Sequence, residues 1–230
     1  MSARKAKPTT VTIGTLDFTS GLALAMRFVS NDRMLPSING VLLTELDGRL
    51  HLQATDRYRA VIVRSDATAP RGLRHLITSD EAKRLQRVFT ATRRNDPELT
   101  IVIDDGQLSV ASLPDGAEHL WVTFPAPIPG DTPAFPDVGK LLRNEIQQNP
   151  DPTNWHGLNP RFLADFAAFS SGRDPVRVSR RGKITLVEGE RAVGIVMGVR
   201  LSDDDTSRDW SYVLDAPGDE AEIQPEPVAS

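Results

Sequence analysis

A chain of 230 residues with no cysteine has room for one large or two small domains, but it cannot form disulfides, zinc–thiolate sites or a thiol nucleophile. Apolar residues make up 39% of it, which is enough for an ordinary core, and its longest apolar stretch falls far short of a membrane span. The net charge of −4 leaves nucleic acid open as a partner, because the local field on one face can steer a polyanion.

The first part of the chain predicts a β-α-β-β-β unit. The basic start, MSARKAKP, leads into no hydrophobic segment, so we expect a short arm rather than a signal peptide, followed by a strand at 11–14 and an amphipathic helix at 19–30. Residues 38–63, INGVLLTELDGRLHLQATDRYRAVIV, alternate apolar and polar residues as half-buried strands do. Asp47-Gly48 supplies the positive φ angles of a two-residue hairpin turn, and a further strand is expected at 59–64.

The same unit recurs twice. The second copy, residues 71–124, predicts a strand at 73–78, a helix capped by Ser79 that runs to about residue 92, and strands at 99–103, 107–112 and 118–124. The third copy starts near Trp155 and predicts a helix from Asn159 and Pro160 through Phe169, then strands at 175–180, 183–188 and 192–200. Repeats of this size indicate modules that share one core of sheet and helix.

Two segments break the repeat. A proline-rich stretch between the second and third copies is typical of an interdomain connector and predicts a short helix at 140–147. The acidic segment from residue 202 has little periodic structure, so we expect a disordered tail with a docking patch at 210–214. The expected α+β organisation is a full domain of two modules at 10–124, a connector at 125–153, a partial domain of one module at 154–201 and a tail at 202–230.

Five short motifs support a more specific interpretation. They are ING at 38–40, ATDRYRAV at 54–61, FPDV at 135–138, GLNPRFLADF at 157–166 and VMGVRL at 196–201. In content and order they resemble the bacterial DNA polymerase III β sliding clamp family, with ATDRYR and MGVRL as the most specific. The resemblance covers roughly residues 10–201 and implies a DNA-clamp fold built from repeated β-α-β-β-β modules.

The chain departs from the family pattern in three ways. The resemblance covers the family's middle domain and part of its last one, so the first domain and one module of the last have no counterpart. Gly198 stands where the family usually has proline. A further 29 residues follow Leu201, where the family normally stops. Ring closure is therefore an open question at the level of the sequence.

The family's peptide-binding pocket maps onto this sequence. The resemblance implies apolar walls that accept Leu or Phe anchors of a partner's short motif, with Arg59 or Arg200 holding its polar groups. Each residue alone is more often strand core or a solvated charge, and only their joint occurrence favours a pocket. The matching positions are Ile38, Thr55, Arg57, Tyr58, Arg59, Ala60, Pro136, Lys140, Leu141, Asn159, Phe162, Ile195, Val196, Met197, Gly198, Val199, Arg200 and Leu201.

The resemblance also implies helices that face DNA and contact its phosphates loosely. Lys83, Arg84 and Arg87 share one face of the second predicted helix. Arg93 and Arg94 have an alternative role, because basic residues at a helix C-terminus complement the helix dipole. The expected DNA-facing residues are Arg27, Lys83, Arg84, Arg87, Arg93, Arg94, Arg161 and Arg173. A second basic cluster, Arg177, Arg180, Arg181 and Lys183, is interpreted as a solvated edge.

The sequence carries no signature of an enzyme. Its histidines, His51, His75, His119 and His156, have no carboxylate at metal-ligand spacing, and the common phosphate-loop, nucleophile and zinc-helix motifs are absent. The run Asp203-Asp204-Asp205 is typical of solvated charge in a polar tail. We therefore expect no catalytic residue, no metal and no cofactor.

The expected function is that of a cytoplasmic processivity factor in DNA replication. The implied partners are double-stranded DNA bound weakly and without sequence preference, DNA polymerase and other proteins with clamp-binding motifs, a clamp loader and further copies of the chain, but no membrane. The alternatives are a truncated paralogue acting as a non-encircling adaptor or inhibitor, and a structural protein with the same fold. We also expect self-association to cover the apolar helix face of the third copy, where Phe162, Phe166 and Phe169 recur at helical spacing.

Overall fold

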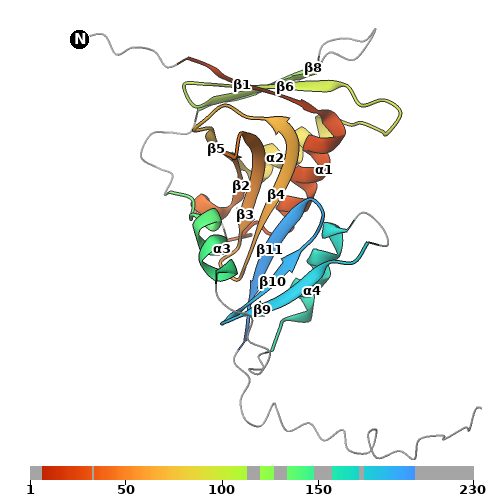
Figure 1. Cartoon of the computed structure of the whole chain (residues 1–230). Helices are drawn as coiled ribbons and strands as arrows, with labels where there is room; N and C mark the ends of the chain where they lie inside the picture. The colour runs from red at the N-terminus through yellow and green to blue at the C-terminus, as the bar shows by residue number, and fades with distance from the viewer. Residues whose placement is uncertain are drawn as a thin grey trace, which may run out of the picture. The chain divides into compact units, whose positions relative to one another are not determined.

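Three modules in sequence order make up the described part of the chain, which in this computed structural model comprises residues 7–32, 34–112, 120–126, 134–147, 157–170 and 174–199 (Figure 1). Module 1 consists of β1 (Thr9–Gly14), α1 (Thr15–Met26), η1 (Pro36–Ile38), β2 (Gly40–Leu46), β3 (Arg49–Thr55) and β4 (Arg59–Thr68). Module 2 consists of β5 (Arg74–Thr78), α2 (Ser79–Val88), β6 (Glu98–Asp104), β7 (Gln107–Ser112) and β8 (Leu120–Phe124). After α3 (Val138–Ile146), module 3 consists of α4 (Pro160–Asp165), η2 (Phe166–Phe169), β9 (Arg177–Arg181), β10 (Ile184–Glu188) and β11 (Ala192–Met197).

The predicted Asp-Gly hairpin turn is confirmed. Asp47 and Gly48 have φ angles of 53° and 73°, and the corresponding pair in module 2, Asp105 and Gly106, has φ angles of 49° and 79°. Positive φ at both central residues is the geometry that lets two twisted antiparallel strands follow each other directly. These turns are therefore determined by local sequence.

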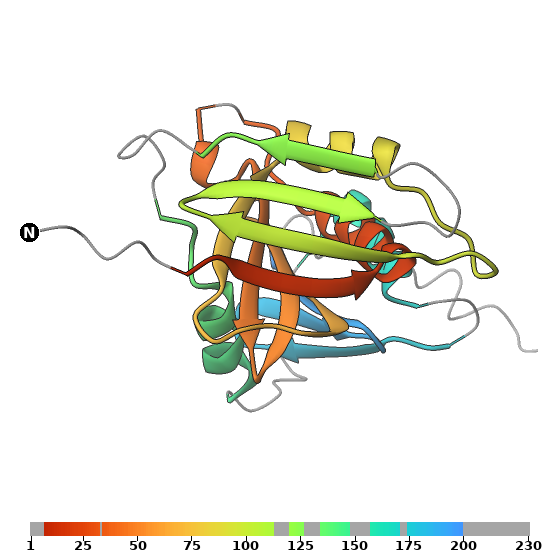
Figure 2. The same ribbon diagram turned by 90° about the horizontal axis from the view of Figure 1, so that it is seen from above.

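Modules 1 and 2 each give their first strand to the other module's sheet. β1 pairs antiparallel with β6 in a four-stranded sheet of order β1-β6-β7-β8, whose strands run side by side in Figure 2. β5 pairs antiparallel with β2 at the edge of the second sheet. Each sheet is completed by a strand of the other module, so neither module has a complete sheet of its own.

Module 3 extends the second sheet instead of building its own. β11 pairs antiparallel with β4, from Ala192 opposite Val63 to Val196 opposite Arg59. The result is a seven-stranded sheet of order β5-β2-β3-β4-β11-β10-β9 (Figure 1). This sheet crosses the boundary predicted between the full and the partial domain.

The main hydrophobic core lies between the helices and the sheets. α1 packs against α2 and against β2, β3 and β4, while α2 also contacts β5 and β8. Phe18, Leu22, Phe28 and Leu85 are fully buried there, and burial of a side chain of this size contributes about 1.5–3 kcal/mol. We call the side of the seven-stranded sheet that faces this core the helix face, and the opposite side the α3 face.

α3 covers part of the α3 face. Val138 and Leu142, one turn apart, pack with Phe135 onto Ala60 and Ile195 in a second, smaller core. The Asp137 side chain caps the helix by accepting from the Lys140 backbone N–H at 2.8 Å. The short helix predicted at 140–147 is thus found at Val138–Ile146.

The helix of module 1 was predicted four residues too late. α1 starts at Thr15, directly after β1, and has no side-chain cap from its own N-cap residue. Instead the Leu16 N–H donates to the Asp96 carboxylate at 2.7 Å, and the Thr15 N–H donates to the Pro97 carbonyl at 3.0 Å. Because this cap comes from about 80 residues away, local pattern cannot locate the helix start. The helix also ends at Met26, before the predicted residue 30.

The helix of module 2 was correctly placed but its cap was wrong by one residue. Thr78, not Ser79, is the N-cap, and it forms a capping box with Glu81 in which each side chain accepts from the other residue's backbone N–H. The helix ends at Val88 rather than near residue 92. Thr92 and Asn95 instead close a tight turn through two backbone hydrogen bonds of 2.9 and 3.0 Å.

The expectation that self-association covers the apolar helix face of the third copy is wrong for Phe166 and Phe169. The predicted helix is split into α4 and the 3₁₀ turn η2, and η2 places Phe166 and Phe169 against Phe28, with ring centroids 5.1 and 5.8 Å apart. Both rings are buried. Module 1 therefore covers this face, because β11 adds to β4 and brings η2 over the end of α1.

Candidate functional site

The turn between β3 and β4 carries four of the predicted pocket residues. Its Asp56 carboxylate accepts from the backbone N–H groups of Tyr58 and Arg59 at 2.9 and 2.7 Å, and the Thr55 hydroxyl donates to the Arg59 carbonyl at 2.7 Å. These bonds hold Arg57 at a φ of 80°, a left-handed conformation that costs a bulky residue about 1 kcal/mol or more. The ATDRYR motif is thus a rigid turn.

Arg59 is a structural residue at the seam between modules 1 and 3. Its side chain is only 8% exposed, and its guanidinium pairs with Asp56 at 2.8 Å and with Asp165 of α4. It also donates to the Arg27 carbonyl at 3.0 Å and lies 4.4 Å from the centroid of the Phe162 ring. Since these internal partners already take up its charge, we assign Arg59 to positioning the turn rather than to holding a ligand's polar groups, the role first expected for it.

Tyr58 and Phe162 stack beside this ion pair. Their ring centroids are 6.2 Å apart, and the Tyr58 side chain is 55% exposed. Asn159 starts α4 as predicted, since its side chain accepts from the Arg161 N–H at 3.0 Å. Phe162 packs against the main core and near Arg59, so it faces module 1 on the helix face of the sheet.

Another group of predicted pocket residues meets on the α3 face. Ala60 lies opposite both Thr55 and Ile195 in the sheet register, so these three share one row. Met197 is two residues beyond Ile195 and therefore on the same face. Met197 and, on α3, Leu141 are 46% and 44% exposed beside the buried cluster. We call this set the anchor surface; it comprises Thr55, Ala60, Pro136, Lys140, Leu141, Ile195 and Met197.

The remaining pocket predictions lie elsewhere. Val196 faces the main core on the helix face, like Arg59 and Phe162. Ile38 is buried in η1, and it belongs to neither hydrophobic cluster. Gly198 and Val199 continue β11, where Val199 exchanges backbone hydrogen bonds of 2.7 and 2.9 Å with Gly157. Arg200 and Leu201 lie outside the described residues.

The basic residues predicted to face DNA are spread over three helices. On α2, Lys83, Arg84 and Arg87 are exposed; Lys83 lies 3.8 Å from Asp80, and the Arg84 guanidinium lies 5.7 Å from the Phe124 ring. Arg27 at the end of α1 lies 3.8 Å from Asp165. Arg93 and Arg94 are exposed in the turn after α2, Arg161 is exposed on α4, and Arg173 lies outside the described residues.

Comparison with known proteins finds a match in structure but not in sequence. No protein-family model matches the chain, and no curated protein is significantly similar to it. The crystal structure of a DNA polymerase sliding clamp from Pseudomonas aeruginosa matches with a TM-score of 0.63 and 18% identity, over 87% of this chain and 69% of the clamp. DNA polymerase III subunit β from Borrelia burgdorferi matches with a TM-score of 0.62 and 11% identity, over 88% and 66%. The Caulobacter crescentus β sliding clamp matches with a TM-score of 0.58 and 14% identity, over 94% and 70%.

The chain has the sliding-clamp fold. The resemblance seen in the five motifs is thereby confirmed at the level of the fold. The chain spans about two thirds of the length of these clamps.

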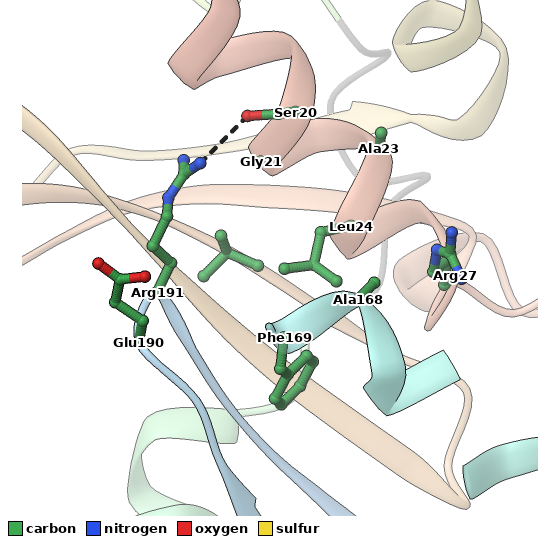
Figure 3. Close-up of a pocket in the computed structure, with 10 residues that line it drawn as sticks. Ser20, Gly21, Ala23, Leu24, Arg27, Ala168, Phe169, Glu190 and Arg191 are labelled. Carbon is green, nitrogen blue, oxygen red and sulfur yellow. Dashed lines mark hydrogen bonds between the residues drawn. The ribbon is translucent and has the colours of Figure 1, made fainter. Parts of the chain in front are cut away.

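A groove on the helix face of this clamp fold marks the seam between modules 1 and 3 (Figure 3). It has a volume of about 270 Å³, and Figure 3 shows Glu190 and Arg191 at one end and Arg27 at the other. Small residues of α1, Gly21 and Ala23, leave the gap open. The anchor surface does not line this groove, so the two features are separate.

Arg191 closes one end of the groove and is a residue that the sequence did not single out. Its guanidinium pairs with Asp17 of α1 and donates to the Ser20 hydroxyl at 3.2 Å, the bond drawn in Figure 3. Burial raises the pKa of Asp17, against the opposing effect of Arg191. Arg191 and Asp17 are 174 residues apart, and neither residue type nor spacing signals their contact.

Two histidines, His51 and His75, lie within the described residues. Burial lowers the pKa of His75, and burial is also the main reason that the pKa of His51 is lowered. His119 and His156 lie outside the described residues. Across the described ranges, no three His, Asp or Glu side chains are grouped so that they could hold a metal ion. None of the helices that the structure describes combines the length and apolarity needed to cross a bilayer.

Proposed function

We propose that this protein is a sliding-clamp-like accessory of DNA replication that tethers a partner protein through the anchor surface. The observation that carries the proposal is the exposure of Met197 and Leu141 next to the buried Ala60 and Ile195. Exposed apolar side chains on a surface that is otherwise buried under α3 favour a partner that inserts apolar side chains of its own.

The chemistry of this surface fits a short linear motif. Met197 is exposed beside the buried Ala60 and Ile195, and its flexible thioether adapts to Leu or Phe anchors. Lys140 is exposed on the same helix as Leu141 and can pair with an acidic group of the partner. Antiparallel pairing joins β4 to β11, and the Arg59–Asp165 ion pair adds a second link between modules 1 and 3, so the surface is preorganised.

The structural neighbours add support. The Caulobacter crescentus clamp was crystallised with polyethylene glycol at a region named for tethering the β-motif, and the Borrelia burgdorferi subunit was crystallised with a natural product. By extension, the proposed partners of this chain are double-stranded DNA bound weakly by the helix charges, a DNA polymerase or other proteins with clamp-binding motifs, a clamp loader and further copies of the chain.

A second candidate function uses the anchor surface alone. A non-encircling adaptor or inhibitor would bind clamp-binding motifs without enclosing DNA, and the exposed Met197 and Leu141 would serve it equally well. Retention on DNA separates the two functions. A closed ring stays on circular DNA in high salt and leaves when the circle is cut, whereas an adaptor is retained by neither form.

The anchor surface itself is tested by titrating a fluorescent peptide that carries a Gln followed by paired Leu and Phe residues. Saturable binding of micromolar strength is expected, with competition by the unlabelled peptide. Absence of binding by folded protein at millimolar peptide would remove the tethering role, for ring and adaptor alike.

A further inference from the structure

Among the described strands, β9 forms one edge of the seven-stranded sheet, at a position where the corresponding strands of modules 1 and 2 are flanked by a further strand. In modules 1 and 2 the strand that follows the helix is flanked by the other module's first strand: β5 lies on β2, and β1 lies on β6. β9 is the corresponding strand of module 3, yet in the part of the chain that the structure describes no strand pairs with its outer side. The internal repeat thus defines a position for one more strand.

The side chains of β9 give this edge a strong positive charge. Arg177, Arg180 and Arg181 lie within five residues, and Lys183 follows in the turn to β10. In the register with β10, Arg177 lies opposite Glu188. Two of the arginines are fixed along the edge: Arg181 donates to the Ile146 carbonyl of α3 at 2.9 Å, and Arg180 donates to the Gly182 carbonyl at 3.3 Å.

Apolar side chains alternate with these charges. Val178 lies opposite Val187, which belongs to the main core, so Val178 points to the helix face, where it is 59% exposed. On the α3 face, Ser179 lies opposite Leu186 of the second core. Exposed Ile146 lies beside Arg181 on that side. The edge therefore offers an apolar contact on each face between cations.

We propose that β9 binds an acidic, extended segment of another polypeptide as an added antiparallel strand. The backbone groups on its outer side would supply the hydrogen bonds, as in other cases where a peptide extends a sheet edge. Antiparallel addition follows from the chain's own covering strands, which are both antiparallel to the strands they flank. The exposed side chains select a partner with Asp or Glu opposite Arg177 and an aliphatic residue opposite Val178.

A second copy of β9 is a poor occupant of this edge. Two β9 strands paired about a two-fold axis would place arginines opposite arginines, and like charges across a strand pair are destabilising. Edge charges also guard against unspecific pairing, but that role alone does not explain the exposed Val178 between them. An acidic strand satisfies both features.

The experiment uses the full chain and a fluorescent, blocked seven-residue peptide of alternating Glu and Val. Anisotropy titration should show saturable binding that weakens as salt is raised. A peptide with alternate backbone nitrogens methylated keeps its charge but cannot form the strand, so it should not bind. Arg177→Glu should weaken binding about tenfold, because an attraction becomes a repulsion. Arg64→Glu, an exposed reversal on a central strand of the same sheet, should leave it unchanged.

Several outcomes would overturn the proposal. If the methylated peptide binds equally well, the peptide is held by its charge alone and does not add a strand to the sheet. Absence of saturable binding by folded protein at millimolar peptide would mean that the edge is covered or only protective. Self-association that disappears in Arg177→Glu would make a second copy the occupant. Met197→Ala should not alter binding of the acidic peptide, so this result is independent of the anchor surface.

Discussion

Arg59 and Asp165 form an ion pair that joins β4 of module 1 to α4 of module 3, across 106 residues of sequence. A second pair crosses the same seam in the opposite sense, from Arg191 of module 3 to Asp17 of module 1. Together with the pairing of β11 on β4, these contacts fix how module 3 meets module 1. The anchor surface uses residues from both modules, so its geometry depends on this seam.

Arg59→Met should therefore lower the free energy of unfolding by about 2–3 kcal/mol. It leaves the carboxylates of Asp56 and Asp165 without their main partner at a largely buried position, and the cost is moderated because Asp165 is partly exposed. Arg49→Met is the matched control, since Arg49 pairs with the exposed Asp66 and should change stability by no more than about 0.5 kcal/mol. Urea denaturation measures both, and equal effects would contradict the assigned role of Arg59.

Gly194→Ala should destabilise the seam by about 1–3 kcal/mol. A Cβ at this position would lie 2.8 Å from the Phe166 ring and 2.9 Å from the Ala60 carbonyl, so the aromatic cover of module 3 must shift. Gly21→Ala is the contrasting variant: its Cβ would meet only ordinary contacts at 3.5 Å or more, and Ala in the interior of α1 should stabilise by up to about 1 kcal/mol. In thermal unfolding, the midpoint temperature of Gly194→Ala should lie below that of the wild type, and the midpoint temperature of Gly21→Ala should lie above it.

His75 should make the protein less stable in mild acid. Burial lowers its folded-state pKa below the ordinary 6.5, so the unfolded chain takes up the proton first as the pH falls. Its contribution to stability is complete above pH 6.5 and is lost as the pH falls from there toward the folded pKa. The stability difference between His75→Gln and wild type should thus be constant between pH 7.5 and 8.5, and should shift in favour of the variant near pH 5.5. A His75 pKa at or above 6.5 by NMR titration would rule this out.

Met197→Ala should weaken binding of the Gln, Leu and Phe peptide about five- to tenfold, because it removes an exposed apolar contact of the anchor surface. Met34→Ala is a matched control. That methionine is 86% exposed, belongs to neither hydrophobic cluster and is not among the pocket residues, so its truncation should not change affinity. If both variants bind like the wild type, Met197 makes no contact with the peptide.

Reversal of charge at Lys83, Arg84 and Arg87 should abolish binding to duplex DNA. All three are exposed on α2, and the proposed contact is weak, indifferent to sequence and steeply reduced by salt, by about 0.9 in log–log slope for each phosphate neutralised. Reversal at Arg177 and Lys183, on the edge of the sheet, provides a control that changes the net charge in the same direction, by four units (2 × 2) instead of six (3 × 2). Equal loss in both variants would point to net charge instead of a DNA-facing helix.

Local features of this fold were predictable because the chemistry that produces them lies within a few residues. Short stretches of sequence predict the Asp47-Gly48 turn, and the alternation of apolar and polar residues predicts β2 and β3. The acidic residues of its first turn mark the start of α2 in the same way. The repeat of β-α-β-β-β units in modules 1 and 2 was visible for the same reason. The five motifs then indicated the clamp fold, which the structural matches confirm.

Only the tertiary structure decided how the modules combine. Neither the exchange of β1 and β5 nor the start of α1 at a cap from Asp96 follows from local pattern, because each depends on groups far apart in the chain. The same holds for Arg59, which the motif placed in a pocket and the structure places in a buried ion pair with Asp165. The sequence by itself determined which segments become strands and helices, since hydrophobic period and turn chemistry are local. Which edge each strand joins, and which charges are buried, depends on contacts between distant segments, among them the packing of Phe166 and Phe169 onto Phe28 of module 1.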